Sequence, residues 1–294
     1  MARREARLAV IGGSGLYAMP GLSDVEWIEV DTPFGAPSDA IAIGELAGAA
    51  VAFLPRHGRG HRLSPTEVPS RANMYALKSL GVERVISVSA VGSLREEIAP
   101  LDLVVPDQLI DRTKARPASF FVDGVVAHIG FAEPFCPDLS ASLAAAMGAL
   151  ADIRYHRGGT YVCMEGPQFS TRAESAVYRQ WGCDIIGMTA LPEAKLAREA
   201  ELCYATIACV TDYDVWRTSE EAVTVEMVVA NLTRNVANAQ RIIRAVAEAL
   251  PADRATASCG CAHALDSAVM TDRALITPEL RARYGLLLGA RLDG

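Results

Sequence analysis

Short apolar segments alternate with longer amphipathic segments along most of the chain, and this alternation constrains the fold more than any other feature. Runs of about 4–8 apolar residues are typical of buried strands, and apolar residues at three- and four-residue spacing are typical of helices. The alternation predicts an α/β protein with helices around a central mixed sheet. We expect strands at residues 7–11, 40–46, 49–54, 83–89, 102–106, 158–163, 184–187 and 202–210. We expect helices at residues 67–80, 137–151, 171–182, 190–200 and 223–249.

No repeat, low-complexity segment or linker interrupts this pattern, so we predict one domain over residues 1–294. Thr171 and Glu174 have the spacing of a capping box, which marks the start of one helix. The pattern weakens after Pro251, and residues 251–294 are predicted to form a C-terminal tail that begins as a loop packed on the body.

The first strand ends in a glycine-rich turn, Gly12-Gly13-Ser14-Gly15. A dinucleotide fingerprint places a helix directly after such a turn, but Met19-Pro20-Gly21 follows here instead. No Gly-Lys-Ser/Thr follows, which excludes a P-loop. Exposed amides and the Ser14 hydroxyl fit a small anion, and a plain tight turn is the alternative.

Two further strand ends have the same character. "PRHGRGH", residues 55–61, follows the strand at 49–54 and places Arg56 and His57 at the strand's carboxyl end, where α/β proteins bind ligands. Arginine and histidine donate to phosphate oxygens, although solvated loop charges are the alternative. Small residues, including Ser89 and Ala90, are expected to form a loop after the next strand. Together these loops predict an anion site.

Two later segments have the chemistry to bind an organic ring. Phe169, in "EGPQFSTRAE", can stack on a flat ring. Asp212 and Asp214 end the very apolar strand 202–210 and form a base-recognition pair, a metal pair or a solvent-facing turn. Nothing nearby supplies the further oxygen ligands that magnesium prefers.

Composition narrows the function classes. The formal net charge is −7 and no basic stripe is present, which argues against binding to nucleic acid. The apolar part of the N-terminus is shorter than the ~7–15 residues of a signal peptide core, and no run reaches the ~18–20 residues of a membrane span. We therefore expect a cytoplasmic protein that is not bound to a membrane.

The chain has 7 cysteines, and most lie in apolar segments, where buried thiols are expected. Cys259-Gly260-Cys261 differs because it lies in a polar part of the tail, near His263. A zinc site needs more ligands, and the sequence offers no second pair at a suitable spacing. We therefore expect a labile disulfide or two free thiols there, and no metal.

Many long motifs, in this order, resemble the methylthioadenosine phosphorylase branch of the trimeric purine nucleoside phosphorylases. The resemblance covers residues 8 to about 245 and is carried by IGGSGLY, VDTPFGAPSDA, RHGRGH, ANMYALK, SAVGSLREEI, DQLIDRT, RPASFF, AEPFCP, EGPQFSTRAES, GMTALPEAKLARE and CYATIACVTDYDVW. It implies a single αβα domain, a homotrimer, and a pentosyltransferase of purine and methionine salvage. The implied reaction is phosphate-dependent cleavage of 5′-methylthioadenosine to adenine and 5-methylthioribose 1-phosphate. Inorganic phosphate would be a co-substrate, and no cofactor would be needed.

The resemblance also implies a role for particular residues. Phosphate would be bound by Ser14, Arg56, His57, Ser89, Ala90 and Thr189. The nucleoside would be bound by Phe169 against the base, Met188 at the ribose, Asp212 and Asp214 at the N7 and N6 edge, and the neighbouring subunit's copy of His128 near the methylthio group. Asp212 would be the catalytic acid at N7. Gly187 stands where some relatives have asparagine, so a sugar or base contact is in doubt.

Three alternatives remain open from the sequence. A phosphorylase of 6-oxopurine nucleosides or methylthioinosine would more naturally place asparagine at 212, because an amide donates to O6. A non-catalytic nucleoside- or phosphate-binding protein would bind without turnover. A dinucleotide oxidoreductase lacks its acidic ribose-binding residue, since Asp31, near the right distance, precedes Thr32-Pro33.

Overall fold

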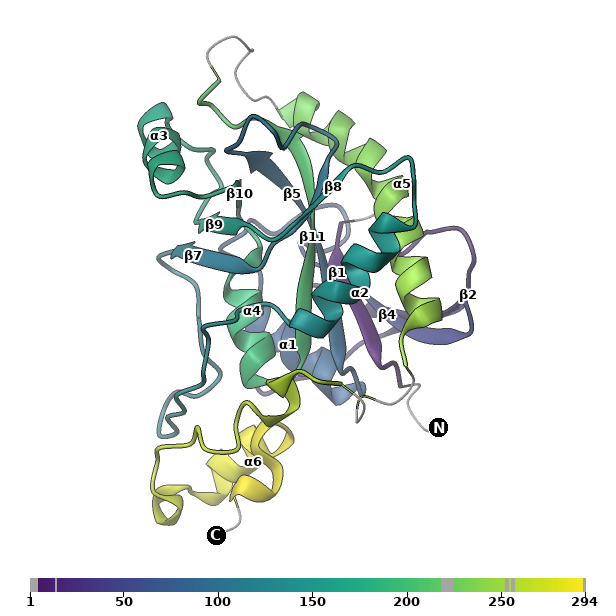
Figure 1. Ribbon diagram of the computed structural model, residues 1–294. Helices are drawn as coiled ribbons and strands as arrows, with labels where there is room; N and C mark the ends of the chain where they lie inside the picture. The colour runs from purple at the N-terminus through teal and green to yellow at the C-terminus, as the bar shows by residue number, and fades with distance from the viewer. Residues whose placement is uncertain (1–4, 14, 218–224, 252–253, 255–256, 293–294) are drawn as a thin grey trace.

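A mixed β-sheet forms the centre of the molecule, and helices cover both of its faces (Figure 1). The computed structural model describes residues 5–13, 15–217, 225–251, 254 and 257–292. The strands are β1 (Leu8–Gly12), β2 (Leu22–Ile28), β3 (Ile41–Leu46), β4 (Ala49–Pro55), β5 (Arg84–Ser93), β6 (Leu103–Val105), β7 (Gln108–Arg112), β8 (Tyr155–Arg157), β9 (Thr160–Met164), β10 (Ile185–Gly187) and β11 (Cys203–Asp212). The helices are α1 (Ser70–Ser79), α2 (Pro137–Gly148), α3 (Arg172–Gln180), α4 (Ala190–Glu199), α5 (Val225–Ala249) and α6 (Pro278–Leu288).

The strand order is β2-β3-β4-β1-β5-β10-β9-β7, and β11 pairs with both β5 and β6. The inner strands β4, β1, β5 and β11 are parallel to one another, whereas β3 runs antiparallel to β4, β10 to β5 and β6 to β11. The predicted α/β fold with a mixed sheet is therefore confirmed.

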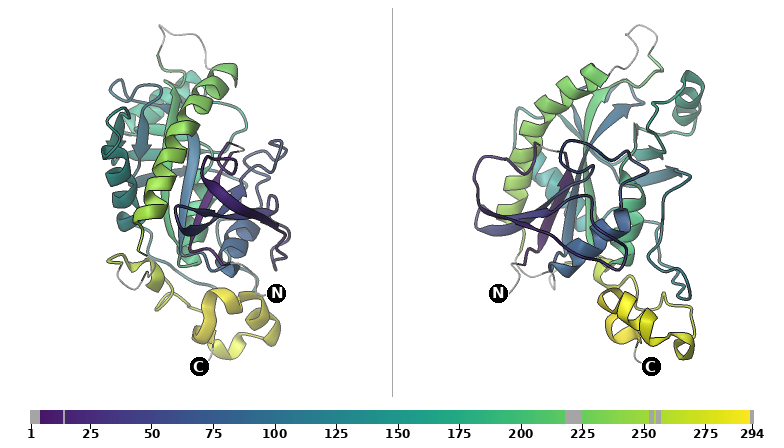
Figure 2. Two further views of the ribbon diagram at one scale, coloured as in Figure 1. Left: turned by 90° about the vertical axis from the view of Figure 1, so that its right-hand side faces the viewer. Right: turned by 180° about the vertical axis from the view of Figure 1, so that it is seen from behind.

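Alternating residues of β1 face two separate cores. Leu8 and Val10 pack in one core with residues of α2 and α5, and Ala9 and Ile11 pack in the other with residues of α1 and α4. Figure 2 shows α5 running along one side of the sheet in both views. A strand buried on both faces has no polar alternation, which is why these segments are continuously apolar in sequence.

The sequence prediction was wrong or incomplete in several places. Strands β2, β7 and β8 were not predicted, because their side chains are exposed or only half-buried and give no apolar run. The predicted loop at Ser89 and Ala90 is wrong. Strand β5 runs from Arg84 to Ser93, so it extends beyond the expected strand at residues 83–89. The start of the helix expected at 223–249 lies partly outside the described residues, and α5 begins at Val225. The capping box of Thr171 and Glu174 is confirmed.

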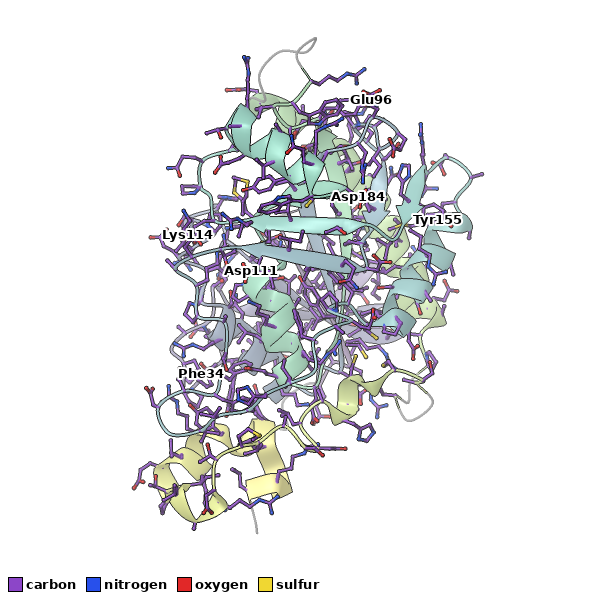
Figure 3. All side chains as sticks on the ribbon, turned by 60° about the vertical axis from the view of Figure 1, so that its left-hand side comes forward. Phe34, Glu96, Asp111, Lys114, Tyr155 and Asp184 are labelled. Atoms are coloured by element: carbon purple, nitrogen blue, oxygen red, sulfur yellow. The ribbon has the colours of Figure 1, made fainter. Side chains whose placement is uncertain are left out.

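The C-terminal segment is more ordered than a tail. It contains α6 and short 3-10 turns, including Gly260–His263, and it contributes Leu265, Tyr284 and Leu288 to the core. The Phe34 ring lies 6.3 Å from the Tyr284 ring, and Figure 3 shows Phe34 beside this segment.

Candidate functional site

The predicted phosphate and base motifs meet at one edge of the sheet. Strands β4, β1, β5 and β11 are neighbours and parallel, so their carboxyl ends lie along the same edge. Gly12 ends β1 beside Pro55 of β4, Arg56 and His57 follow β4, and Asp212 ends β11 beside Gly92 of β5. This edge is where α/β sheets bind their ligands.

Arg56 is buried and held in a fixed orientation. Its Nε donates to Glu193 Oε1 at 2.6 Å, its Nη1 to the Val88 carbonyl at 2.8 Å, and its Nη2 to Ser87 Oγ at 2.7 Å. Burial alone would lower the pKa of Arg56, but the Glu193 carboxylate outweighs it and raises the pKa above its usual value. The guanidinium is therefore a permanent, positioned cation at this edge.

Glu193 is a residue that the sequence analysis missed. It lies in α4, is 3% exposed, and also accepts a hydrogen bond from Tyr204 Oη at 2.9 Å. It contacts Arg56 across 137 positions of sequence, so no local pattern could have paired them. The Arg56–Glu193 pair fixes the direction in which the guanidinium points.

His57 is neutral in this environment. Burial and the charge of Arg56 lower the pKa of His57 to about 4. Its Nδ1 lies 2.8 Å from the Leu63 carbonyl oxygen, and a carbonyl only accepts, so Nδ1 carries the proton. The other ring nitrogen, Nε2, is therefore a hydrogen-bond acceptor.

Three buried hydroxyl groups lie together near Arg56. Ser89 and Thr189 interact with Tyr161, and burial raises the pKa of Tyr161 to about 12, so its hydroxyl is neutral. Ser89 Oγ, Thr189 Oγ1 and Tyr161 Oη are each buried without a hydrogen-bond partner of acceptable geometry among the described residues. Thr189 precedes α4, yet it does not use its hydroxyl to cap that helix. Buried polar groups are rarely left unpaired, which makes these three hydroxyls candidate ligand-binding groups.

Tyr161 explains the glycine at position 187. A Cβ atom at Gly187 would lie 2.1 Å from the Tyr161 hydroxyl oxygen. The phenol therefore occupies the space that a side chain at 187 would need. A polar group from β9 therefore stands where an asparagine side chain at 187 would lie.

A small cavity lies between Arg56, His57 and the loop before α4. Its lining includes Arg56, His57, Met188, Thr189, Glu193 and Arg116. Arg116 was not predicted as a site residue; its guanidinium donates to the Met188 carbonyl at 2.5 Å and to the Leu191 carbonyl at 2.6 Å. It also donates to Glu165 Oε1 at 3.2 Å, so it ties the loop at 188–191 to the segment after β9. Arg116 thus positions Met188 and Thr189.

The two predicted base-binding carboxyls differ in their surroundings. Asp212 Oδ1 accepts from the Asp214 backbone N–H at 2.8 Å, and its Oδ2 accepts from Thr211 Oγ1 at 2.6 Å. The pairing register of β11 with β5 shifts between Val210 and Asp212, a bulge of the kind that redirects side chains. Asp214 Oδ2 is buried without a partner among the described residues, and burial raises the pKa of Asp214. A buried carboxyl with a raised pKa is a candidate proton donor.

The four remaining predicted residues differ in where they lie. Ser170, the residue after Phe169, interacts with Asp214, so the Phe169 segment lies at the carboxyl pair, and the Phe169 side chain is 43% exposed. Ala90 lies within β5, opposite Cys209 of β11. His128 is held through its backbone N–H to the Ala268 carbonyl and is not among the residues that line the cavity. Ser14 lies outside the described residues.

One group of side chains in the described part of the chain could hold a metal ion, and it is not at this edge. It consists of Cys136, Cys203, Cys259 and Cys261. Asp212 and Asp214 are not part of such a group. A dinucleotide site is also not formed, because β1 is followed by turns and β2 rather than by a helix.

Comparison with known proteins agrees with this geometry. Residues 7–248 match the family model of the phosphorylase superfamily. The chain is 59% identical over 274 residues to S-methyl-5′-thioadenosine phosphorylase of Gloeobacter violaceus, covering 92% of this chain and 91% of that one. It is 62% identical over 241 residues to the same enzyme of Chloroflexus aurantiacus, covering 82% and 83%.

Solved structures are equally similar. A methylthioadenosine phosphorylase from an Antarctic soil metagenomic library superimposes with a TM-score of 0.91 at 50% identity, covering 97% of this chain and 99% of that one. The Schistosoma mansoni methylthioadenosine phosphorylase in complex with adenine superimposes with a TM-score of 0.82 at 36% identity, covering 90% and 97%. The chain therefore belongs to the phosphorylase superfamily and, within it, to the family of S-methyl-5′-thioadenosine phosphorylases.

Proposed function

We propose that this protein is a pentosyltransferase that cleaves 5′-methylthioadenosine with inorganic phosphate, giving adenine and 5-methylthioribose 1-phosphate. Its family membership supports this reaction. So do the Schistosoma mansoni structures, one of which contains adenine and another, a variant of that enzyme, methylthioadenosine.

The observation that carries the phosphate assignment is the pairing of a buried cation with three buried, unpaired hydroxyls. Arg56 supplies a fixed charge, and Ser89, Thr189 and Tyr161 supply donors that no described residue satisfies. An anion with several oxygens satisfies all of them at once, and phosphate is such an anion. The neutral His57 adds an acceptor for a protonated phosphate oxygen.

The reaction needs little covalent chemistry from the protein. As the bond to the purine breaks, positive charge grows on the ribose and negative charge on the base. A phosphate held beside the anomeric carbon stabilises the sugar by charge and by proximity. The Arg116 guanidinium holds the Met188 carbonyl, and we assign Met188 to the ribose.

At the base, we place Asp212 at N7 and Asp214 at the 6-amino edge, with one proton shared by the pair. The Asp214 backbone N–H joins the two residues at Asp212 Oδ1, and burial, which raises the pKa of Asp214, favours a proton on the pair. A proton donated to N7 neutralises the leaving adenine. The remaining carboxylate oxygens accept from the 6-amino group, which favours adenine over 6-oxopurines.

We further propose a homotrimer that acts in the cytoplasm without a catalytic cofactor. His128 does not line the cavity of its own chain, which fits a role in a neighbour's pocket. None of the described helices is both long and apolar enough to span a bilayer. Size-exclusion chromatography with light scattering tests the trimer: a mass of three chains is expected, and a monomer that is fully active contradicts the shared pocket.

The test of the reaction is base release from 5′-methylthioadenosine, 5′-methylthioinosine, adenosine and inosine, each with and without phosphate. We expect phosphate-dependent release of adenine, fastest from the methylthio substrate. Release of hypoxanthine alone would keep the phosphate site and overturn the assignment of the carboxyl pair. Binding of nucleoside without release from any substrate would indicate a non-catalytic binding protein.

A further inference from the structure

Four cysteines from distant parts of the sequence lie together at the start of β11, at the opposite end of that strand from Asp212. Cys136 precedes α2, Cys203 begins β11, and Cys259 and Cys261 flank Gly260 in the C-terminal segment. Their four Sγ atoms all lie within 4.8 Å of one another, and the Cys203 and Cys259 sulfurs are 3.6 Å apart. All four are free thiols in the structure, three buried and Cys259 half-buried.

Hydrogen bonds to backbone groups, rather than contacts between the sulfur atoms, bring the four cysteines together. The Cys136 N–H donates to the Tyr204 carbonyl at 2.7 Å, which fixes the start of α2 against the start of β11. The Asp138 carboxylate accepts from the backbone N–H groups of Ser258 and Cys259 at 2.7 and 3.0 Å. Figure 1 shows the C-terminal segment beginning beneath β11 and α2. The four-sulfur arrangement is thus built into the fold.

We propose that these four cysteines bind one Zn²⁺ ion in a tetrahedral site. With Zn–S bonds of about 2.3 Å, a tetrahedron places its sulfurs about 3.8 Å apart. The observed separation of 3.6 Å and the upper bound of 4.8 Å differ from this value by about 1 Å or less, which side-chain rotation accommodates. Four sulfur ligands in a tetrahedral arrangement select zinc or iron over magnesium, calcium and manganese.

The electrostatic surroundings fit a complex that carries excess negative charge. Four thiolates and one Zn²⁺ have a net charge of −2, and the cation Arg198 acts electrostatically on Cys261. Arg198 is itself held by the Gly130 and Glu133 carbonyls at 3.2 and 2.6 Å. The site therefore has a positioned counter-charge.

The proposed ion is structural rather than catalytic. Cys203 and Asp212 are the two ends of the ten-residue strand β11, which at about 3.3 Å per residue separates them by about 30 Å. Four protein ligands leave no open coordination position for water or substrate. The ion would instead fasten the C-terminal segment to α2 and β11. That segment also pairs with the chain around His128, through Ala127 and Val269.

This proposal differs from the sequence-based expectation of no metal, because the missing ligands are two isolated cysteines. Cys136 and Cys203 lie 67 positions apart, and Cys203 lies 56 positions before Cys259, so no spacing rule connects them. The competing chemistry at the same sulfurs is disulfide formation, which requires an oxidant. Metal content and oxidation state distinguish the two.

The test measures metal in the full-length protein, purified without chelators under reducing conditions and with any affinity tag removed. Elemental mass spectrometry is expected to find about one zinc per chain, and replacement by Co²⁺ is expected to give the absorption spectrum of a tetrahedral tetrathiolate site. Cys203→Ser and Cys259→Ser should each retain much less than one zinc. The matched control is Cys209→Ala, because Cys209 is buried in the same core as Cys203 and lies on the same strand but outside the cluster.

A second measurement keeps the test decisive if the serine variants fail to fold. Intact mass of the wild-type protein should show all 7 cysteines reduced, and removing the metal should lower the melting temperature and increase the reactivity of four thiols. A metal-free protein that has lost two hydrogens for each of one or two disulfides would overturn the proposal. So would a metal-free protein with every thiol reduced, or equal zinc content in Cys203→Ser and the control.

Discussion

The Tyr161 hydroxyl offers the sharpest test of the phosphate site, because the structure predicts a loss of binding without a loss of stability. In the structure without ligand this hydroxyl is buried and has no hydrogen-bond partner among the described residues. Tyr161→Phe therefore removes no intramolecular bond, and the free energy of unfolding should stay within about 0.5 kcal/mol of wild type or rise. With phosphate bound, the same hydroxyl donates to a charged oxygen. Removing such a bond costs about 1.5–3 kcal/mol, so the KM for phosphate should rise about 10- to 100-fold.

Tyr284→Phe is the matched control. Tyr284 is also fully buried, but its hydroxyl donates to the Val122 carbonyl at 2.8 Å. This variant should lose about 1–2 kcal/mol of stability and leave the KM for phosphate unchanged. Initial rates at varied phosphate, with urea unfolding of both variants, provide the comparison. An unchanged phosphate KM in Tyr161→Phe refutes the assignment, and a stability loss equal to that of the control shows that the hydroxyl had a structural partner.

Further predictions concern Arg56, His57 and the carboxyl pair. Arg56→Ala should raise the phosphate requirement and, because it leaves Glu193 buried and unpaired, lower the unfolding free energy by about 3–5 kcal/mol; adding Glu193→Gln should recover stability but not phosphate affinity, and phosphate dependence that stays at the wild-type level would contradict the anion site. Because the pKa of His57 falls from 6.5 when unfolded to about 4 when folded, its contribution to stability is complete above pH 6.5 and is lost as the pH falls toward 4. That loss amounts to about 2 kcal/mol at pH 5; urea unfolding of His57→Asn should lack it, and an identical pH dependence in the variant would rule out His57 as the cause. Asp212→Asn should slow cleavage of 6-aminopurine nucleosides more than of 6-oxopurine ones, and equal losses would undo the specificity argument. Asp214→Asn, which suits the positive φ of 51° there, should shift the alkaline limb of the rate profile, where a pair that shares a proton loses it; an unmoved profile would assign the proton to Asp212 alone.

The central strands could be predicted from the sequence because burial on both faces makes them continuously apolar. β1, β4 and β11 are examples, and their ends correctly located Arg56, His57 and Asp212. β2 could not be predicted in this way, since its side chains face solvent and have no apolar pattern. Helix α6 was also missed, although Thr277 as N-cap and Pro278 in the first turn are a typical helix start.

The site was predictable only where its residues lie in compact motifs. Glu193 and Tyr161 stand in segments whose local sequence gives no sign of a site, and only the folded chain brings them to Arg56 and Thr189. The same reason hid the cysteine cluster, since sequence spacing reports ligand pairs on one loop but not single residues before α2 and at the start of β11. Strand register and long-range packing determine which of these residues meet, and neither can be predicted from a short stretch of sequence.

The most direct test of the proposed reaction follows the phosphorus atom. Phosphorus-31 NMR of the protein with 5′-methylthioadenosine and inorganic phosphate should show a sugar 1-phosphate resonance that grows in equal amount to the adenine released. The inorganic phosphate signal should fall by the same amount. Adenine release with inorganic phosphate unchanged and free methylthioribose formed would mean hydrolysis by water, and would contradict phosphate as the nucleophile in the site around Arg56.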